Sequence, residues 1–339
     1  MHRPDVEFPD MGMGRDSSSA HELRRASQTG DLKAVKYLTE EKRLNPLQED
    51  EDGRNAIYCA AKGGQLAVLK YFIEDQGHNP ASAGSTRRLA GMTPLHIAAR
   101  HNHLELVRYL VTEQQVDPMC QAEVGSTPLH QACHDDNNMD VVVYLVNAMS
   151  QHLPLKDVVS CRGKDGKIPL QSAALFGQLK IIKYFITELN CDSSVVQTGE
   201  LHGRPTKGGG RIALHSAAQR GHLHVLKFLV EDLHCDPSHC DYEKVTPLHM
   251  AAGRGRLAVV QYLTLEQHCD PLCTNSRSNT PLHNAAYRGQ LEVVRFMIET
   301  LHCPPDIRGW HNRTPLEQAR SRGHHHVVKY LESLRPQLK

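Results

Sequence analysis

The sequence predicts an all-α solenoid, in which short helix–turn–helix units stack side by side. Three observations lead to this prediction. The word TPLH occurs four times, at 93–96, 127–130, 246–249 and 280–283. The segments around it recur at a spacing of 34 residues or slightly more. Each segment contains two stretches of helical periodicity with a glycine between them, as expected for a repeat protein whose units share one core.

The repeated word sets the boundaries of the units. Its first position is taken by Thr93, Thr127, Ile168, Ile212, Thr246, Thr280 and Thr314, and two earlier segments place His21 and Asn55 there. We therefore expect nine units, starting near residues 21, 55, 93, 127, 168, 212, 246, 280 and 314. They would form one repeat domain over 20–339. Residues 1–19 lack the pattern and are predicted to be a disordered tail.

Each unit is predicted to contain two helices and an extended finger. At Thr280 a hydroxyl can cap the first helix, and Pro281 fits the first turn because its missing N–H is not needed there. Gly289 ends this helix. The following stretch, LEVVRFMIE, has the apolar spacing of an amphipathic second helix. Turn residues then lead to the next unit through an extended loop or β-hairpin.

These residues resemble the ankyrin repeat, whose usual pattern is TPLHxAA, a glycine turn, a second helix and a β-hairpin loop. The resemblance covers residues from about 20 to 339. One difference is a longer segment after the second helix, such as EQHCD at 266–270, which makes the unit 34 residues long and not 33.

Composition limits the class of protein. The chain has 39 lysines and arginines against 38 acids, so its net charge of +1 gives no general attraction to nucleic acid or membranes. No apolar run has the length of a membrane span, and ten cysteines in 339 residues favour reduced thiols. We therefore expect a cytoplasmic protein, with the nucleus as an alternative, and no membrane insertion.

Catalytic motifs are not found. The sequence has no phosphate-binding GxxxxGK[ST], no GxSxG, no HExxH and no paired CxxC. The repeats also occupy nearly the whole chain. We expect a non-enzymatic protein without a cofactor.

The histidines of the repeated word are predicted to be structural. His215, His249 and His283 are 34 residues apart, so stacking separates them by about 10 Å, too far to share one zinc ion. The resemblance implies that each imidazole hydrogen-bonds the threonine and ties adjacent units together. An alternative is a metal- or redox-responsive finger, with His234, His239, Cys240 and Cys273 as the candidate ligands.

The ankyrin resemblance implies that a partner lies along the concave face. The residue just before the glycine turn, at the end of the first helix, would face it. Four of these residues are arginines at a constant spacing of 34, namely Arg220, Arg254, Arg288 and Arg322. Phe176 has the same position earlier in the chain. Such an arginine ladder suits carboxylates or phosphates. The alternative is that these arginines are solvated residues that complement helix dipoles.

Aromatic residues provide further candidate contacts, because tyrosine, tryptophan and arginine dominate binding hot spots. Trp310 is the only tryptophan and is predicted at a finger tip beside His311. Tyr242 has the matching position two units earlier, and Tyr287 precedes Arg288.

The sequence thus favours a monomeric protein-interaction scaffold or adaptor, with an acidic segment as ligand. The alternatives are the Cys/His finger, or an anionic small molecule or nucleic acid on the arginine ladder. Nucleic acid is disfavoured, because only Tyr287 offers a stacking ring beside the ladder.

Overall fold

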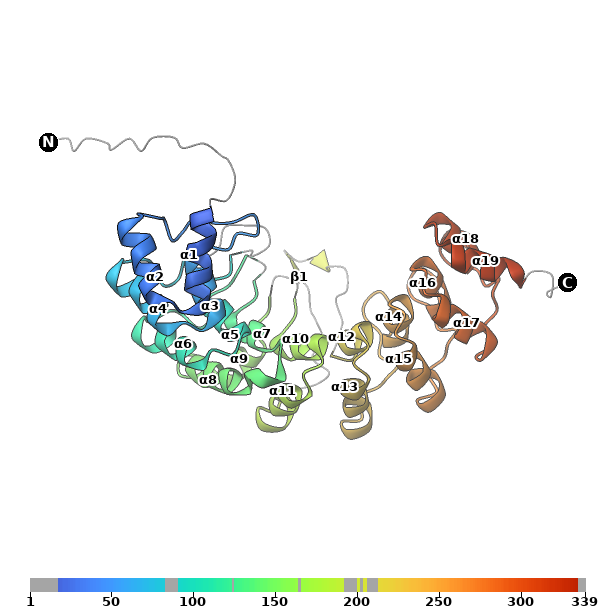
Figure 1. Cartoon of the computed structure of the whole chain (residues 1–339). Coiled ribbons are helices and arrows are strands. Elements are labelled where there is room, and N and C mark those ends of the chain that lie inside the picture. The colour runs from blue at the N-terminus through green and yellow to red at the C-terminus, as the bar shows by residue number, and fades with distance from the viewer. Residues whose placement is uncertain are drawn as a thin grey trace.

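The computed structural model describes residues 18–82, 91–123, 125–163, 166–191, 200–201, 204–205 and 213–334. Figure 1 shows a curved row of helix pairs, with the amino-terminal pairs at one end and the carboxy-terminal pairs at the other. The first helix of each pair lies on the inner side of the arc, and the second lies on the outer side. The predicted all-α solenoid of stacked units is confirmed.

The first helices begin at the repeated word. Where TPLH occurs, threonine is the N-cap and proline the first helical residue, as at Thr280 and Pro281. The first helices are α1 (Ser18–Thr29), α3 (Ala56–Gly63), α5 (Pro94–Arg100), α7 (Pro128–Ala132), α10 (Pro169–Phe176), α12 (Ala213–Arg220), α14 (Pro247–Gly253), α16 (Pro281–Tyr287) and α18 (Pro315–Ser321). In the first pair the helix already includes Ser18, so His21 lies inside it and not at its start.

The second helices form the outer row. They are α2 (Leu32–Lys36), α4 (Leu66–Lys70), α6 (Leu104–Arg108), α8 (Met139–Ser150), α11 (Leu179–Lys183), α13 (Leu223–Lys227), α15 (Leu257–Gln261), α17 (Leu291–Glu299) and α19 (His325–Ser333). Six of them continue into a π-helical turn, namely η1 (Tyr37–Glu41), η2 (Tyr71–Asp75), η3 (Tyr109–Glu113), η5 (Tyr184–Glu188), η6 (Phe228–Asp232) and η7 (Tyr262–Glu266).

This π-helical ending accounts for the longer segment after the second helix. A π turn holds one residue more than an α turn. In η7 the N–H of Gln267 donates to the carbonyl of Tyr262 at 3.0 Å. His268 then adopts a left-handed φ of 52°, and the N–H of Cys269 donates to the carbonyl of Leu263 at 2.9 Å. The buried Cys269 is the apolar residue that commonly closes such a helix end.

The connections between units are tight turns. In one finger tip the N–H of Asn275 donates to the carbonyl of Asn279 at 3.0 Å. The extended connection after α8 contains a further helix, α9 (Leu155–Val159). A short helical turn, η4 (Asp136–Asn138), precedes α8, and another, η8 (Trp310–Asn312), lies in the last finger. Among the described residues, one finger contains strands, β1 (Glu200–Leu201) paired antiparallel with β2 (Arg204–Pro205).

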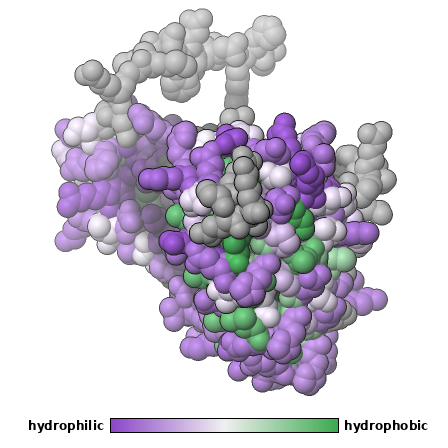
Figure 2. Space-filling view, turned by 90° about the vertical axis from the view of Figure 1, so that its right-hand side faces the viewer, coloured by the Kyte–Doolittle hydropathy of each residue, from purple (hydrophilic) through white to green (hydrophobic). Residues whose placement is uncertain are grey.

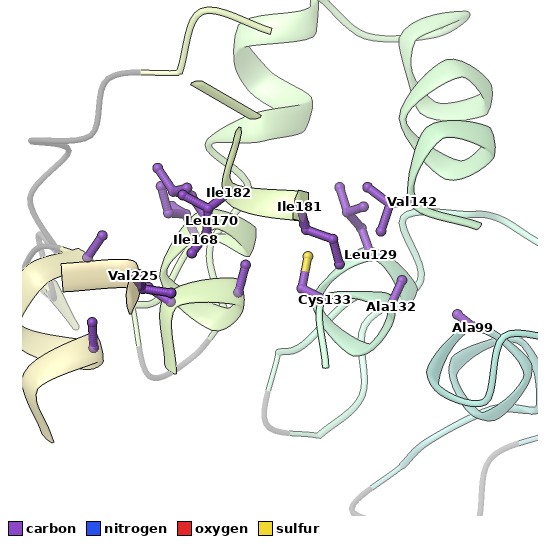
Figure 3. Close-up of a cluster of buried hydrophobic side chains, with 14 of the residues drawn as sticks. Ala99, Leu129, Ala132, Cys133, Val142, Ile168, Leu170, Ile181, Ile182 and Val225 are labelled. Atoms are coloured by element: carbon purple, nitrogen blue, oxygen red, sulfur yellow. The ribbon is translucent and has the colours of Figure 1, made fainter. Parts of the chain in front are cut away.

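One hydrophobic core runs through the stack. The leucine of the repeated word is buried in successive units, for example Leu129, Leu248 and Leu282. Figure 3 shows how this core crosses unit boundaries, with Leu129 and Cys133 of one unit beside Ile181 of the next. Because every inner layer is shared by two units, no unit can bury its apolar face alone.

The histidines of the repeated word connect neighbouring units, as predicted. The Nδ1 atom of His249 accepts from the backbone N–H of Thr246 at 3.3 Å and from its hydroxyl at 2.9 Å. The Nε2–H on the other side of the ring donates to the carbonyl of Asn279, in the next finger, at 3.0 Å. His96 makes the same contacts with Thr93 and Ser126.

Candidate functional site

A groove of about 400 Å³ lies on the inner side of the carboxy-terminal units. The ends of α14 and α16 form one wall, and the finger tips around Asn275 and Trp310 form the other. We call it the C-terminal groove and define it by these lining residues: Gln219, Glu243, Val245, His249, Met250, Gly253, Arg254, Asn275, Arg277, Asn279, Asn284, Tyr287, Arg288, Trp310, Arg313, Gln318 and Ser321.

Two arginines of the predicted ladder line the groove. Arg254 and Arg288 are the C-cap residues of α14 and α16, and both side chains are exposed. The glycine that follows each arginine turns the chain toward the second helix, with φ of 70° at Gly255 and 74° at Gly289. The backbone geometry of the two caps is nearly the same, so the two arginine side chains leave the chain at equivalent places on neighbouring units.

The groove is positively charged. Arg254, Arg277, Arg288 and Arg313 line it, together with a single acid, Glu243. Within the described part of the chain, none of these four arginines forms an ion pair.

Neighbouring arginines also influence one another electrostatically. Burial lowers the pKa of Arg254, and repulsion from Arg288 and Arg220 lowers it further. An anion between these guanidinium groups would relieve this repulsion.

The finger wall contributes an aromatic ring. The guanidinium carbon of Arg277 lies 5.4 Å from the centre of the Trp310 ring, within the range of a cation–π contact. The backbone N–H of Trp310 donates to Oδ1 of Asn279 at 3.0 Å, and the same oxygen accepts from Gln318. These bonds fix the base of the finger, while residue Trp310 stays 44% exposed.

The remaining residues predicted for partner binding lie outside this lining. Arg322 is the next rung of the ladder, and its guanidinium carbon lies 4.3 Å from the centre of the Tyr287 ring. Arg220, at the end of α12, is exposed. Tyr242 is 61% exposed on its finger tip. His311 packs beside Trp310, with 4.0 Å between the ring centres.

Phe176 has a local packing role. Its ring stacks on His134 of the preceding unit, with 3.7 Å between the ring centres, and the side chain is half-buried. Burial lowers the pKa of His134 to about 3. This pair lies in an earlier part of the stack, so Phe176 does not join the arginines in the C-terminal groove.

Most lining residues were not predicted from the sequence, and Arg277, Arg313 and Gly253 are the most important of these. Arg277 and Arg313 come from different positions of successive fingers, so no constant spacing connects them. Gly253 lacks a side chain at the position that Tyr287 fills one unit later. The signal that could have found it is this change from glycine to tyrosine beside two successive ladder arginines.

The proposed Cys/His finger is not formed by its candidate ligands. All four belong to the described stretch 213–334, where no three His, Cys, Asp or Glu side chains are arranged to hold a metal ion. Cys273 instead packs against Thr246 and His249, at 3.9 Å from each. Burial raises the pKa of its thiol to about 11, which keeps it protonated and weakly nucleophilic.

No helix among the described residues is long and apolar enough to cross a membrane. Figure 2 views the molecule from the right-hand side of Figure 1, where the carboxy-terminal helices lie. On this face, hydrophobic side chains form small groups between larger hydrophilic areas.

This chain is similar to parts of several much longer proteins. The human "Transient receptor potential cation channel subfamily A member 1" is 25% identical over 53% of this chain and 14% of its own length. "Palmitoyltransferase AKR1" of Debaryomyces hansenii is 26% identical over 42% of this chain and 17% of its own length. "Putative ankyrin repeat protein" of Rickettsia bellii is 33% identical over 25% of this chain and 12% of its own length. The chain thus spans less than a fifth of each of these relatives.

A family model described as "Ankyrin repeats (3 copies)" matches residues 23–122, 112–197, 195–275 and 255–337. These matches overlap, so they do not count the units, and the number nine stays a prediction. Together they extend over nearly the whole described structure, whose paired helices and repeated histidine contacts agree with the match. The chain therefore belongs to the ankyrin-repeat family.

Proposed function

We propose that this chain is a protein-interaction module, whose C-terminal groove binds an acidic segment of a partner protein. Ankyrin repeats are generally protein-interaction modules. The observation that supports the acidic ligand is the convergence of Arg254, Arg277, Arg288 and Arg313 on one groove with a single acid, Glu243. Arginine binds carboxylates through a planar fork of donors, so these four groups suit a chain of Asp and Glu residues.

Charge distribution supports the same ligand. Residues 211–339 contain 16 lysines and arginines against 12 acids, whereas the rest of the chain contains 23 against 26. The carboxy-terminal part is thus the basic part of a nearly neutral molecule. Attraction to an acidic partner would be strongest at the groove and would weaken with added salt.

The proposed role is binding without catalysis. The groove presents guanidinium groups, amides and aromatic rings, which are groups that bind the surface of a partner protein. The histidine that reaches the groove, His249, is held by Thr246 and Asn279, and burial lowers its pKa to about 4. We propose that the protein acts as a monomer in the cytoplasm or nucleus, where cysteines are kept reduced.

Partner capture from a cell extract tests this function. The groove variant carries Arg254→Glu and Arg288→Glu. The matched control carries Arg25→Glu and Lys329→Glu, which change the net charge equally at exposed positions of α1 and α19. Proteins that bind the wild type and the control, are lost from the groove variant and contain acidic segments would support the proposal. Retention of the same proteins by all three would place binding elsewhere.

A further inference from the structure

We infer that the C-terminal groove accepts one aromatic or large aliphatic side chain of the acidic segment, inserted into the space above Gly253. This inference rests on the proposed function and adds to it the class of peptide that the groove selects. The ligand would be an extended acidic peptide with an apolar anchor, and not a segment of acidic residues alone.

The space exists because one unit lacks a side chain that its neighbours have. Gln219, Gly253, Tyr287 and Ser321 have the same position in successive units. Gly253 is buried, and a Cβ built on it would make ordinary contacts without a clash, at 3.5 Å from the Cβ of Asn284 and 4.0 Å from the Cγ of Arg288. The backbone there needs no glycine, since Gly253 lies within α14 and its φ is not positive. The backbone conformation therefore does not explain the glycine at this position, and the absence of a side chain leaves room in the groove.

Apolar side chains line the same groove as Gly253. Met250, on the preceding turn of α14, is half-buried, and Tyr287 lies on the neighbouring helix. Trp310 and Val245 line the groove from the fingers. Burial of a large apolar side chain among such groups is favourable by the hydrophobic effect, and an exposed tryptophan adds a flat contact surface.

The arginines around this space set the pattern of charges in the peptide. Arg254 and Arg288 are one unit apart, and stacked helices are separated by about 10 Å. An extended chain advances about 3.3 Å per residue and its side chains alternate between two faces, so acids four residues apart, about 13 Å, share one face with the residue midway between them and can reach successive rungs. An apolar residue between two such acids would then lie over Gly253. The peptide class is an acid–apolar–acid segment in extended conformation.

Trp310 provides a direct readout, because it is the only tryptophan in the chain and it lines the groove. The probes are two synthetic peptides of glycine and regularly spaced glutamates, one with a central phenylalanine and one with alanine in its place. Neither contains tryptophan, so a change in tryptophan emission reports on the groove alone. The affinity of each peptide is measured by titration at low salt.

Two variants that add the same side chain separate the pocket from other effects of the substitution. Gly253→Gln fills the space with a side chain that the preceding unit already carries as Gln219. Ala258→Gln adds glutamine at an exposed position of α15 that does not line the groove, and serves as the matched control. We expect the phenylalanine peptide to bind wild type and Ala258→Gln about tenfold more tightly than the alanine peptide, and this preference to disappear in Gly253→Gln.

Equal binding of the two peptides to all three proteins would overturn the apolar pocket and leave the acidic ligand standing. Absence of binding by both peptides at millimolar concentration would overturn the acidic ligand as well. A third arm uses an oligothymidylate of the same charge as the peptides. If it bound the groove as tightly as the phenylalanine peptide, the groove would recognise charge alone, and the inference would be wrong.

Discussion

His324 packs so closely against Gly289 that a Cβ on this glycine would lie 2.6 Å from its Nδ1 atom. The Nε2 atom on the other side of the ring donates to the carbonyl of Tyr287 at 3.0 Å. His103 lies in the same way against Gly64, and His222 against Gly177. A residue at the start of the second helix thus joins its unit to the glycine turn of the unit before.

Two glycine-to-alanine changes should therefore have opposite effects. Gly289→Ala forces a left-handed residue with φ of 74° to carry a Cβ and collides with His324. We expect it to destabilise the protein by at least about 1–2 kcal/mol. Gly253→Ala, inside a helix and without a collision, should stabilise it by up to about 1 kcal/mol. Urea unfolding followed by circular dichroism measures both, and equal effects would contradict the local geometry.

Stability should fall on acidification because of the buried histidines. Burial lowers the pKa of His96 and of His249 to about 4, whereas histidine in an unfolded chain has a pKa of about 6.5. The unfolded state therefore binds more protons between these two values. The stabilisation is complete above about pH 6.5 and is lost as the pH falls toward 4. Each such histidine should reduce the free energy of unfolding by about 2 kcal/mol between pH 7 and pH 5.

The variant His249→Gln provides the control for this pH dependence. Glutamine is already used at this position in one unit, where Oε1 of Gln171 accepts from the N–H of Ile168 at 3.0 Å. The variant should lose less stability than the wild type between pH 7 and pH 5. An unchanged loss would show that His249 titrates normally and is not buried as described.

Core and groove residues should differ sharply in their effect on folding. Leu248 is 1% exposed, and its replacement by alanine should cost about 2–5 kcal/mol. The double change Arg254→Glu and Arg288→Glu removes exposed side chains that form no ion pair in the described structure, so it should alter stability by less than about 1 kcal/mol. Thermal and urea unfolding check both values. A groove variant as unstable as Leu248→Ala would mean that these arginines support the fold.

The repeat architecture was predictable from sequence because one word carries several structural roles at once. In Thr280 to His283, the threonine caps a helix, the proline starts it, the leucine is buried and the histidine joins two units. Local chemistry and tertiary packing agree at these positions, so the pattern is a reliable guide.

The groove was only partly predictable, because it depends on residues that do not repeat. The ladder supplied Arg254 and Arg288, but Arg277 and Arg313 reach the same groove from unrelated positions of two fingers. Phe176 shares the sequence position of the ladder arginines, yet it stacks on His134 because that unit offers an aromatic neighbour. Spacing identifies equivalent positions, whereas the side chains across the groove decide what each position does.

The most direct test of the central claim is the affinity of the groove for an acidic peptide. The glutamate and phenylalanine peptide is titrated into wild type, the Arg254→Glu and Arg288→Glu variant, and the Arg25→Glu and Lys329→Glu control, with Trp310 emission as the signal. The account predicts that the control binds like wild type, and that the groove variant binds at least about tenfold more weakly. Equal affinity for the groove variant and the wild type would contradict it.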